Sequence, residues 1–395
     1  MNTSSKGDIL KAATKLGLTS FGGPVAHLGY FRQEYVQKRG WLDERSYADL
    51  VALCQFLPGS ASSQVGIGIG LLRGGLPGAL LAWLGFTLPS AAALTVFAYL
   101  LQSWSLQGAW LHGLKLAAVA IVAQAVLGMG RSLAPDRTRA SIALMTATLM
   151  LLWSSAWAQL LLIAAAGAAG LILYRRAEAP ELKMEESQPP LSRKLGAVFL
   201  AVFFILLLLL PLLRSQFPAS WSLALFDGFY RSGALVFGGG HVVLPLLQQE
   251  VVPSGAVSPD QFLAGYGAAQ AVPGPLFTFA AYLGAVIHGW AGAAVATAAI
   301  FAPAFLLTLG ALPFWHTLRH QPKVQRALRG INAAVVGILL AALYDPVWTS
   351  AVRTPADFGL ALLLFGSLVF WKLPPWLVVI AAALCGTAES FLGLS

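Results

Sequence analysis

Charged residues are scarce in this sequence. Of its 395 residues only 10% are Asp, Glu, Lys or Arg, whereas a soluble domain carries about a quarter. Cys54 and Cys385 lie far apart in apolar segments, so neither a disulfide framework nor a cysteine metal site is expected. No signal-peptide pattern opens the chain, because Lys6, Lys11 and Lys15 precede any long apolar run.

Enzyme motifs are also missing. The sequence contains no Gly-x-Ser-x-Gly turn, which would present a nucleophilic serine. We therefore expect no enzymatic activity, no metal and no cofactor.

Apolar residues dominate instead. The hydrophobic fraction is 57% and the mean hydropathy is +0.73. Runs near the ~20 residues needed to cross a bilayer recur along the chain, which predicts an all-α polytopic protein in contact with membrane lipid. The runs cover residues 76–101, 114–129, 140–153, 158–174, 195–213, 291–312, 331–344, 358–371 and 376–391.

The chain is also internally duplicated. A Phe-Gly-Gly tripeptide, a glutamate and a Gln-x-x-Pro-Gly motif occur at residues 21–23, 34 and 55–59, and again at 237–239, 250 and 270–274. The two copies are offset by 216 residues at Glu34 and Glu250, and by 214 at Pro89 and Pro303. Such self-similarity predicts two structural repeats.

The distribution of basic residues predicts the orientation. Lys and Arg cluster at residues 131–139, 175–194 and 319–329, while the turns at 102–108 and 153–157 contain none. By the positive-inside rule the clusters face the cytoplasm. This gives a cytoplasmic N-terminus and a periplasmic C-terminus, and the positive excess is not a nucleic-acid signal.

Matching loops of the two copies carry opposite charge patterns. Residues 31–46 hold four basic side chains, whereas their counterparts at 251–261 hold none. This reversal predicts inverted-topology repeats, which are common in secondary transporters. The expected divisions are an N-terminal repeat at 1–174, a cytoplasmic linker at 175–194, an inverting transmembrane helix at 195–213 and an inverted repeat at 214–395.

Each repeat is expected to begin with broken, re-entrant helices. The apolar segment before Gly22 and Gly23 is too short to span a membrane, and so is the segment before residues 58–59. Glycine and proline end helices at both places. Irregular backbone at membrane depth must be buried in protein or line a cavity. We therefore expect four such breaks to meet near the membrane midplane.

These breaks predict an anion site. Helix starts offer unpaired N–H groups and a partial positive charge. Lys15 and Arg231 are equivalent positions six residues before their breaks, and cations in membrane segments are typically functional, although Lys15 could instead extend to the membrane surface. The expected substrate-binding residues are Lys15, Gly22, Gly23, Gln55, Gly59, Ser60, Ser62, Ser63, Arg231, Gly238, Gly239, Gly240, His241, Gln270, Gly274 and Thr278.

Three further residues are candidates for proton coupling. His27 lies near the first break and can titrate near neutral pH, although it could simply cap the break. Glu34 and Glu250 are repeat equivalents that could carry protons. Either glutamate could instead form an ion pair or face water.

The paired motifs resemble those of the chromate ion transporter family, in its long-chain, two-domain form. The first copy matches through residues 20–24, His27, Glu34, residues 41–42 and residues 55–59. The second matches through residues 237–241, Pro245, Glu250 and residues 270–275. The copies differ locally, because serine follows the first Pro-Gly and proline follows the second.

This resemblance implies efflux of chromate across the bacterial inner membrane. With inverted repeats, the expected mechanism is alternating access. The sequence leaves open whether the substrate is chromate, sulfate or another oxyanion, and whether the protein is a passive anion channel. A homodimer is also left open.

Overall fold

The computed structural model describes residues 5–103, 109–153, 156–174, 191–237, 240–315 and 321–391. All regular secondary structure in these ranges is helical. Five helical stretches are long and apolar enough to cross a membrane, and three shorter apolar helices accompany them. Each of the nine expected apolar runs coincides with helix over most of its length, so the prediction of an all-α polytopic membrane protein is confirmed.

The first repeat begins with short helices. Ser5 caps the first helix by accepting a hydrogen bond from the Asp8 N–H at 3.1 Å, and the left-handed residues Gly22 and Gly23 follow its end. The elements are α1 (Lys6–Thr19), α2 (Gly23–Phe31), the π-helix η1 (Arg32–Lys38), α3 (Glu44–Phe56) and α4 (Ala61–Ser103).

The second repeat reproduces this order. Asp43 caps α3 and Ser258 caps α11, and these caps are 215 residues apart. Its elements are α9 (Trp221–Ala234), the 3-10 helix η2 (Gly240–Val242), α10 (Val243–Val251), α11 (Pro259–Ala271), the 3-10 helix η3 (Leu276–Thr278) and α12 (Phe279–Ala311).

Both long helices, α4 and α12, are folded sharply near their starts. The backbone of α4 leaves helical geometry at Gly74 and Gly75, and that of α12 does so at His288 and Gly289. A Cβ added at Gly70 would overlap the Gly78 carbonyl, so the two arms touch backbone to backbone. The equivalent glycines of α12, 214 residues later, do the same.

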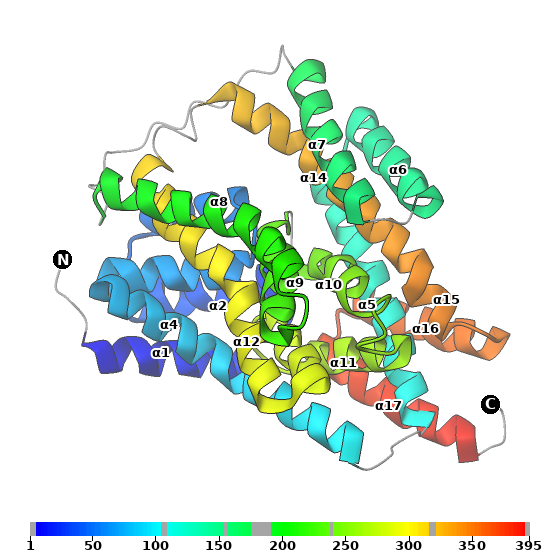
Figure 1. The fold of residues 1–395 in the computed structure, drawn as a ribbon. Coiled ribbons are helices and arrows are strands. Elements are labelled where there is room, and N and C mark those ends of the chain that lie inside the picture. Colours follow the sequence, from blue (N-terminus) through cyan, green and yellow to red (C-terminus); the bar gives the residue numbers. More distant parts are fainter. Residues whose placement is uncertain are drawn as a thin grey trace.

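The later helices of the repeats exchange partners. In Figure 1 α5 lies beside α16 and α17, and α14 lies beside α6 and α7. A Cβ at Gly113 of α5 would overlap the Ala382 carbonyl of α17, and one at Gly330 of α14 would overlap the Ala166 carbonyl of α7. The elements are α5 (Ala109–Leu133), α6 (Arg137–Leu152), α7 (Ala156–Leu173), the 3-10 helix η4 (Leu312–Phe314), α14 (Pro322–Ala342), the π-helix η5 (Leu343–Trp348), α15 (Thr349–Ala351), α16 (Pro355–Val369) and α17 (Pro375–Phe391).

One helix stands outside the matched set. The helix α8 (Arg193–Gln216) packs on α9 and α12 at the outer side of the molecule (Figure 1). Only 17% of the most apolar 18-residue stretch of α8 is buried, against 67% of the corresponding stretch within residues 276–314. Phe204, Leu208 and Leu212 are exposed on it. An apolar surface of this kind suits contact with lipid.

Several features expected from the sequence lie outside the described residues. These include residues 175–190 of the linker, the turn residues 104–108 and 154–155, residues 316–320 of a basic cluster, and the glycines Gly238 and Gly239 of the second Phe-Gly-Gly motif.

Candidate functional site

The helix breaks of the two repeats meet at one place, which we call the crossing and define by Ser20, Gly59, Val236 and Gly274. The Gly59 N–H donates to the Val236 carbonyl at 2.7 Å, and the Gly274 N–H donates to the Ser20 carbonyl at 2.9 Å. Gly59 and Gly274 are repeat equivalents, and so are Ser20 and Val236. The hydrogen bond that the first repeat donates to the second is therefore matched by an equivalent hydrogen bond that the second repeat donates to the first.

Glycine is required at both Pro-Gly breaks. Gly59 has a φ of 118° and Gly274 a φ of 105°, in a region that other residues avoid. A Cβ on Gly59 would lie 3.5 Å from the Ala304 Cβ, and one on Gly274 would lie 2.7 Å from the Ser90 Oγ. Ser90 and Ala304 are themselves equivalent positions, so each break rests against the long helix of the opposite repeat.

The N–H groups of Gly59 and Gly274 lie at the breaks where the sequence predicts anion contacts. In this structure each of them donates to a carbonyl of the other repeat, and the anion contacts expected near these glycines stay a prediction. Gly22 is exposed and Gly23 half-buried at the start of α2, where N–H groups of the first turn lack helical partners. The first turns of α2 and α4, together with side chains near the crossing, are therefore the remaining candidate donors for an anion.

Buried hydroxyl groups follow the first Pro-Gly break. Ser60, Ser62 and Ser63 are each at most 4% exposed. The Ser60 hydroxyl donates to the Ser63 Oγ at 3.1 Å, and the amide of Gln64 donates to the Pro58 carbonyl at 2.9 Å. This start of α4 thus brings three hydroxyl groups and a side-chain amide together inside the protein.

The histidines also lie beside the breaks. His27 is buried, and its Nδ1 lies 3.3 Å from the Ser62 Oγ. His241 follows Gly240 in the second repeat, and its Nδ1 lies 2.8 Å from the Tyr266 hydroxyl. Each histidine therefore faces a hydroxyl group, and proton coupling by His27 stays a prediction.

The second Pro-Gly break is less polar than the first. Pro275, Leu276 and Phe277 occupy the positions that follow it. The Thr278 hydroxyl is buried and donates to the Pro275 carbonyl at 2.7 Å. Gln270 is half-buried, whereas its equivalent Gln55 is exposed.

Polar atoms without partners surround the crossing. Among the described residues, four buried side-chain atoms near it make no hydrogen bond: Ser20 Oγ, Gln64 Oε1, Thr87 Oγ1 and Gln270 Nε2. Buried polar groups are nearly always bonded to protein, water or an ion. Two of these atoms are hydroxyl oxygens and one is an amide nitrogen, so three of the four can donate a hydrogen bond. They therefore suit a small polar ligand.

The first repeat carries a group of ionic side chains beside the crossing. This first ion cluster consists of Lys15, Glu34, Lys38 and Arg39. The Lys15 Nζ lies 2.7 Å from Glu34 Oε2, the Arg39 Nε lies 2.9 Å from Oε1, and the Lys38 Nζ lies 4.0 Å from Oε2. The carboxylate is 6% exposed, whereas the Lys15 side chain is 51% exposed.

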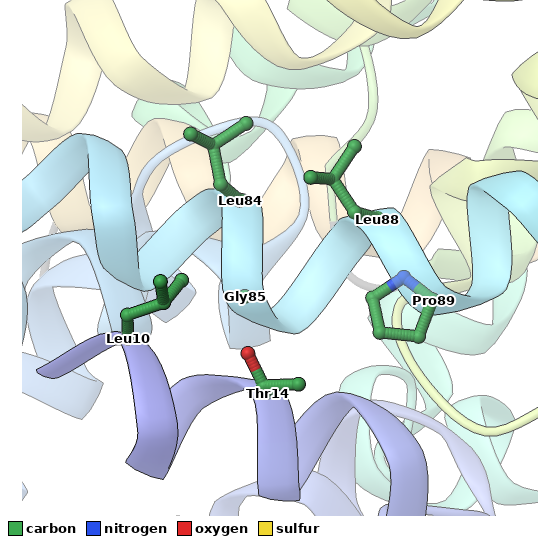
Figure 2. Close-up of a pocket in the computed structure, with 6 residues that line it drawn as sticks. All are labelled: Leu10, Thr14, Leu84, Gly85, Leu88 and Pro89. Atoms are coloured by element: carbon green, nitrogen blue, oxygen red, sulfur yellow. The ribbon is translucent and has the colours of Figure 1, made fainter. Parts of the chain in front are cut away.

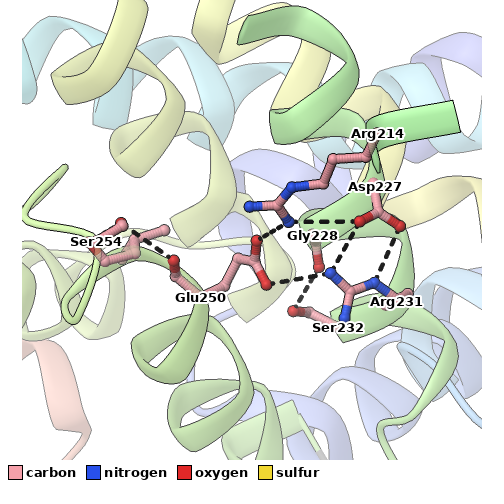
Figure 3. Close-up of polar contacts among 8 residues, drawn as sticks. Arg214, Asp227, Gly228, Arg231, Ser232, Glu250 and Ser254 are labelled. Atoms are coloured by element: carbon pink, nitrogen blue, oxygen red, sulfur yellow. Dashed lines mark hydrogen bonds and ion pairs between the residues drawn. The ribbon is translucent and has the colours of Figure 1, made fainter. Parts of the chain in front are cut away.

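The second repeat carries the equivalent group, shown in Figure 3. This second ion cluster consists of Arg214, Asp227, Arg231 and Glu250. Arg231 donates to both oxygens of Asp227 at 2.9 and 2.8 Å and reaches Glu250 at 3.4 Å. Arg214, at the end of α8, lies 2.6 Å from Glu250. Asp227 is fully buried, and a Cβ on Gly228 would overlap the Glu250 side chain.

The clusters include residues that the sequence analysis missed. Lys15 and Arg231 were singled out as cations, but their partnership with Glu34 and Glu250 was left open. Asp227, four residues before Arg231, had a sequence signal, because opposite charges at this spacing meet on one helix face. Lys38 stands four residues after Glu34 in the same way. Arg214 had no local signal.

Two hollows lie elsewhere and are apolar. One has a volume of about 310 Å³ and is lined by Leu10 and Thr14 of α1 and by Leu84, Leu88 and Pro89 of α4 (Figure 2). The other, of about 410 Å³, lies among α4, α5, α11 and α17. Apolar walls cannot compensate an anion's charge, so neither hollow is the candidate site. In the described part of the chain, no three His, Cys, Asp or Glu side chains could share a metal ion.

Comparison with known proteins identifies the family. The profile of the chromate transporter family matches residues 7–171 and again 223–387. A probable chromate transport protein of Synechococcus elongatus is 29% identical, over 94% of this chain and 92% of its own length. The chromate transport protein of Pseudomonas aeruginosa is also 29% identical, over 94% of this chain and 89% of its own.

A shorter relative matches one repeat. An uncharacterized transporter of Bacillus subtilis is 29% identical over 42% of this chain, and that match covers 95% of the shorter protein. No solved structure matches significantly. The two family matches are offset by 216 residues, as the motifs are, and the resemblance seen in the motifs is confirmed. The chain belongs to the chromate transporter family, a family of membrane transporters and not of enzymes.

Proposed function

We propose that this protein exports chromate from the bacterial cytoplasm and binds the anion at the crossing. The observation that carries the proposal is the exchange of equivalent bonds, from Gly59 to Val236 and from Gly274 to Ser20. It brings the start of α4 beside the end of α9, and the second Pro-Gly break beside the end of α1. A small ligand there touches both repeats at once, as substrates of repeat-built transporters do.

The first repeat is proposed to supply most of the direct contacts. Ser63 offers a hydroxyl donor, which the Ser60 hydroxyl orients by donating to its Oγ, and the starts of α2 and α4 add partial positive charge of about half a unit each. Gln270 adds an amide donor that has no partner among the described residues. A tetrahedral dianion needs several such donors, because an uncompensated buried charge is costly.

The repeats are proposed to have inverted topology. Equivalent bonds exchanged at the crossing, together with the swapped packing of Gly113 and Gly330, fit two copies related by a two-fold rotation. One crossing by α8 between the copies would place them upside down relative to each other. Alternating access then follows from rocking one copy against the other around a fixed site.

The proposed orientation follows the basic residues. The N-terminus and residues 175–194 lie in the cytoplasm, and the C-terminus lies in the periplasm. The divisions proposed from the sequence, 1–174 and 214–395 for the repeats, enclose both family matches. Impermeant maleimide applied to intact cells should leave a cysteine in residues 175–194 unlabelled, and labelling there would contradict this orientation.

Flux measurements test the function. Purified protein in liposomes should give saturable chromate uptake that chromate on the opposite side accelerates, because a carrier returns faster when loaded. Sulfate and molybdate added as competitors rank the oxyanions. A linear, unsaturable flux would indicate a channel, and competition by sulfate alone would indicate a sulfate carrier. Absence of chromate flux above that of empty liposomes would contradict the proposal.

A further inference from the structure

We infer that the first ion cluster is a recruitment site for tetrahedral dianions, separate from the crossing and absent from the equivalent place in the second repeat. The inference rests on the proposed function, since it assigns the side on which the anion is collected. Three features carry it: the charge balance of the cluster, the exposure of its cations and the contrast with the second ion cluster.

The charges of the first cluster do not balance. Lys15, Lys38 and Arg39 surround the single carboxylate of Glu34, which leaves a formal charge of +2. A dianion is the ligand whose charge this excess matches.

The cations are accessible while the carboxylate is not. The side chains of Lys15 and Lys38 are 51% and 53% exposed, and Glu34 is 6% exposed beneath them. An ammonium group has three donors, and Lys15 uses one of them on Glu34. The buried carboxylate holds the cations in place, and the exposure of both lysine side chains leaves them open to an approaching anion.

The cluster also lies close to the crossing. Lys15 is five residues before Ser20, whose carbonyl accepts the Gly274 N–H. At about 1.5 Å per residue along a helix this places the Lys15 backbone roughly 7–8 Å from the crossing. The Lys15 backbone is therefore about one and a half helical turns from the proposed binding site.

The second ion cluster lacks this excess. Arg214 and Arg231 are matched by Asp227 and Glu250, so the formal charge is zero. Arg231 donates two hydrogen bonds to Asp227 and also contacts Glu250 (Figure 3). A neutral, internally bonded cluster does not attract a dianion, so recruitment occurs on one side of the crossing only.

The asymmetry acts on affinity and association rate. Clefts lined by charge of one sign raise the local concentration of oppositely charged ligands. Under the proposed orientation the first cluster faces the cytoplasm, so the anion saturates the carrier at lower concentration from that side. The cluster cannot shift the equilibrium across the membrane, because the same chain carries the anion in both directions.

Vesicles of both orientations test the inference. Chromate uptake is measured in inside-out and right-side-out vesicles from cells producing the full chain, with vesicles from non-producing cells as background. At low salt Lys38→Gln should raise the half-saturating concentration about fivefold to tenfold in inside-out vesicles, which corresponds to losing one charge about 7 Å from a dianion in water. In right-side-out vesicles the change should stay below about twofold, because the anion then binds from the far face and the interaction weakens with distance.

Matched variants separate charge from structure. Arg45→Gln removes an exposed charge from the first turn of α3, outside the cluster, and should change the half-saturating concentration less than about twofold. Lys38→Arg keeps the charge and should behave as the wild type. For the wild-type protein, raising KCl to about 0.5 M should increase the half-saturating chromate concentration much more in inside-out vesicles than in right-side-out ones.

The outcomes distinguish the two proposals. Equal effects of Lys38→Gln in both vesicle types, or equal effects of Lys38→Gln and Arg45→Gln, would overturn the recruitment site while leaving chromate transport intact. If the wild type moves no chromate above background in either orientation, the proposed function itself fails. An effect confined to one orientation and abolished by salt supports the recruitment site.

Discussion

The two repeats share their breaks and folds but differ in the side chains placed at them. In the first repeat serines follow the Pro-Gly break and three cations surround Glu34. In the second repeat Pro275 and apolar residues follow the break, and two arginines balance two carboxylates. Duplication thus preserved the backbone architecture, which needs both copies, while the polar chemistry became concentrated in one of them.

This difference distinguishes the residues that both repeats need for packing from those that are needed in only one repeat for binding. Glycines at the crossing and at the swapped helix contacts occur in both repeats, because each contact needs close approach of two backbones. Hydroxyl groups and excess charge need to occur only once, since one anion occupies one site. Substitutions at matched pairs of positions can test this distinction directly.

The largest effect is expected at the swapped helix contacts. Gly113→Leu and Gly330→Leu should each prevent folding, because the side chain would overlap a backbone carbonyl of the facing helix. Folding is measured by the yield of monodisperse protein in detergent. Gly128→Ala, on the same helix as Gly113 but with open space around it, should leave the yield unchanged. A normal yield for either leucine variant would contradict the equivalence of these contacts.

Loss of transport with retained folding is expected at the crossing. Gly59→Val and Gly274→Val should abolish chromate flux, because both positions have positive φ and lie against the opposite repeat. A non-glycine residue in such a conformation costs about 1–2 kcal/mol. Membrane-inserted Gly59→Val protein with normal flux would exclude the crossing as the site.

Alanine at the same positions should reveal an asymmetry. Gly274→Ala should be more harmful than Gly59→Ala, since its Cβ would lie 2.7 Å from the Ser90 hydroxyl. Adding Ser90→Ala should recover part of the loss, because the second repeat has Ala304 at that position. Flux and thermal stability are compared across these three variants. Equal losses without recovery would show that strain of the backbone dominates.

A smaller difference is expected between the equivalent cations. Arg231→Gln should lower the free energy of unfolding by about 2–3 kcal/mol, because it leaves the fully buried Asp227 with Arg214 as its remaining cation. It should also weaken transport strongly. Lys15→Gln should cost about 1 kcal/mol or less, since Lys15 is half exposed.

Arg231→Lys is the matched control for this comparison. It keeps the charge but cannot donate to both oxygens of Asp227 in a planar pair, so it should restore stability only in part. Denaturation of the purified variants in one detergent measures the differences. Equal stability of the Arg231→Gln and Lys15→Gln proteins would contradict the ranking.

The smallest effect is expected from single hydroxyl groups. Ser63→Ala should raise the half-saturating chromate concentration several-fold, as expected for a hydrogen bond of about 1 kcal/mol. Ser60→Ala should act indirectly, because the Ser60 hydroxyl orients the Ser63 Oγ. Thr278→Val should change it little, because the Thr278 hydroxyl already donates to the Pro275 carbonyl. A larger effect of Thr278→Val than of the serine variants would reverse the proposed division between the repeats.

Much of the architecture could be predicted from the sequence. The breaks after Thr19 and Phe56 follow from Gly22, Gly23 and the Pro-Gly motif, since these residues cannot continue a helix. Apolar runs of membrane-spanning length locate the long helices equally well. These signals are local, and local backbone chemistry is what single sequences carry.

Contacts between distant segments could not be predicted in this way. The sequence does not indicate a contact between Lys15 and Glu34, because a helix break lies between them. Only the folded chain brings the Lys15 Nζ to 2.7 Å from Glu34 Oε2. Likewise nothing near Gly113 indicates Ala382 as its partner. The fold of α4 at Gly74 and Gly75 depends on the fit of Gly70 against Gly78, which is visible only when both arms are in place.

The swapped contacts also constrain how the protein is made. Helices α6 and α7 leave the ribosome early, yet their partner α14 is synthesised only after most of the second copy. The close-fitting surface around Ala166 therefore stays without this partner while the residues between α7 and α14 are synthesised. Helix α5 likewise gains its contact at Gly113 only after α17 has been made, so the packing of each half waits for a helix of the other.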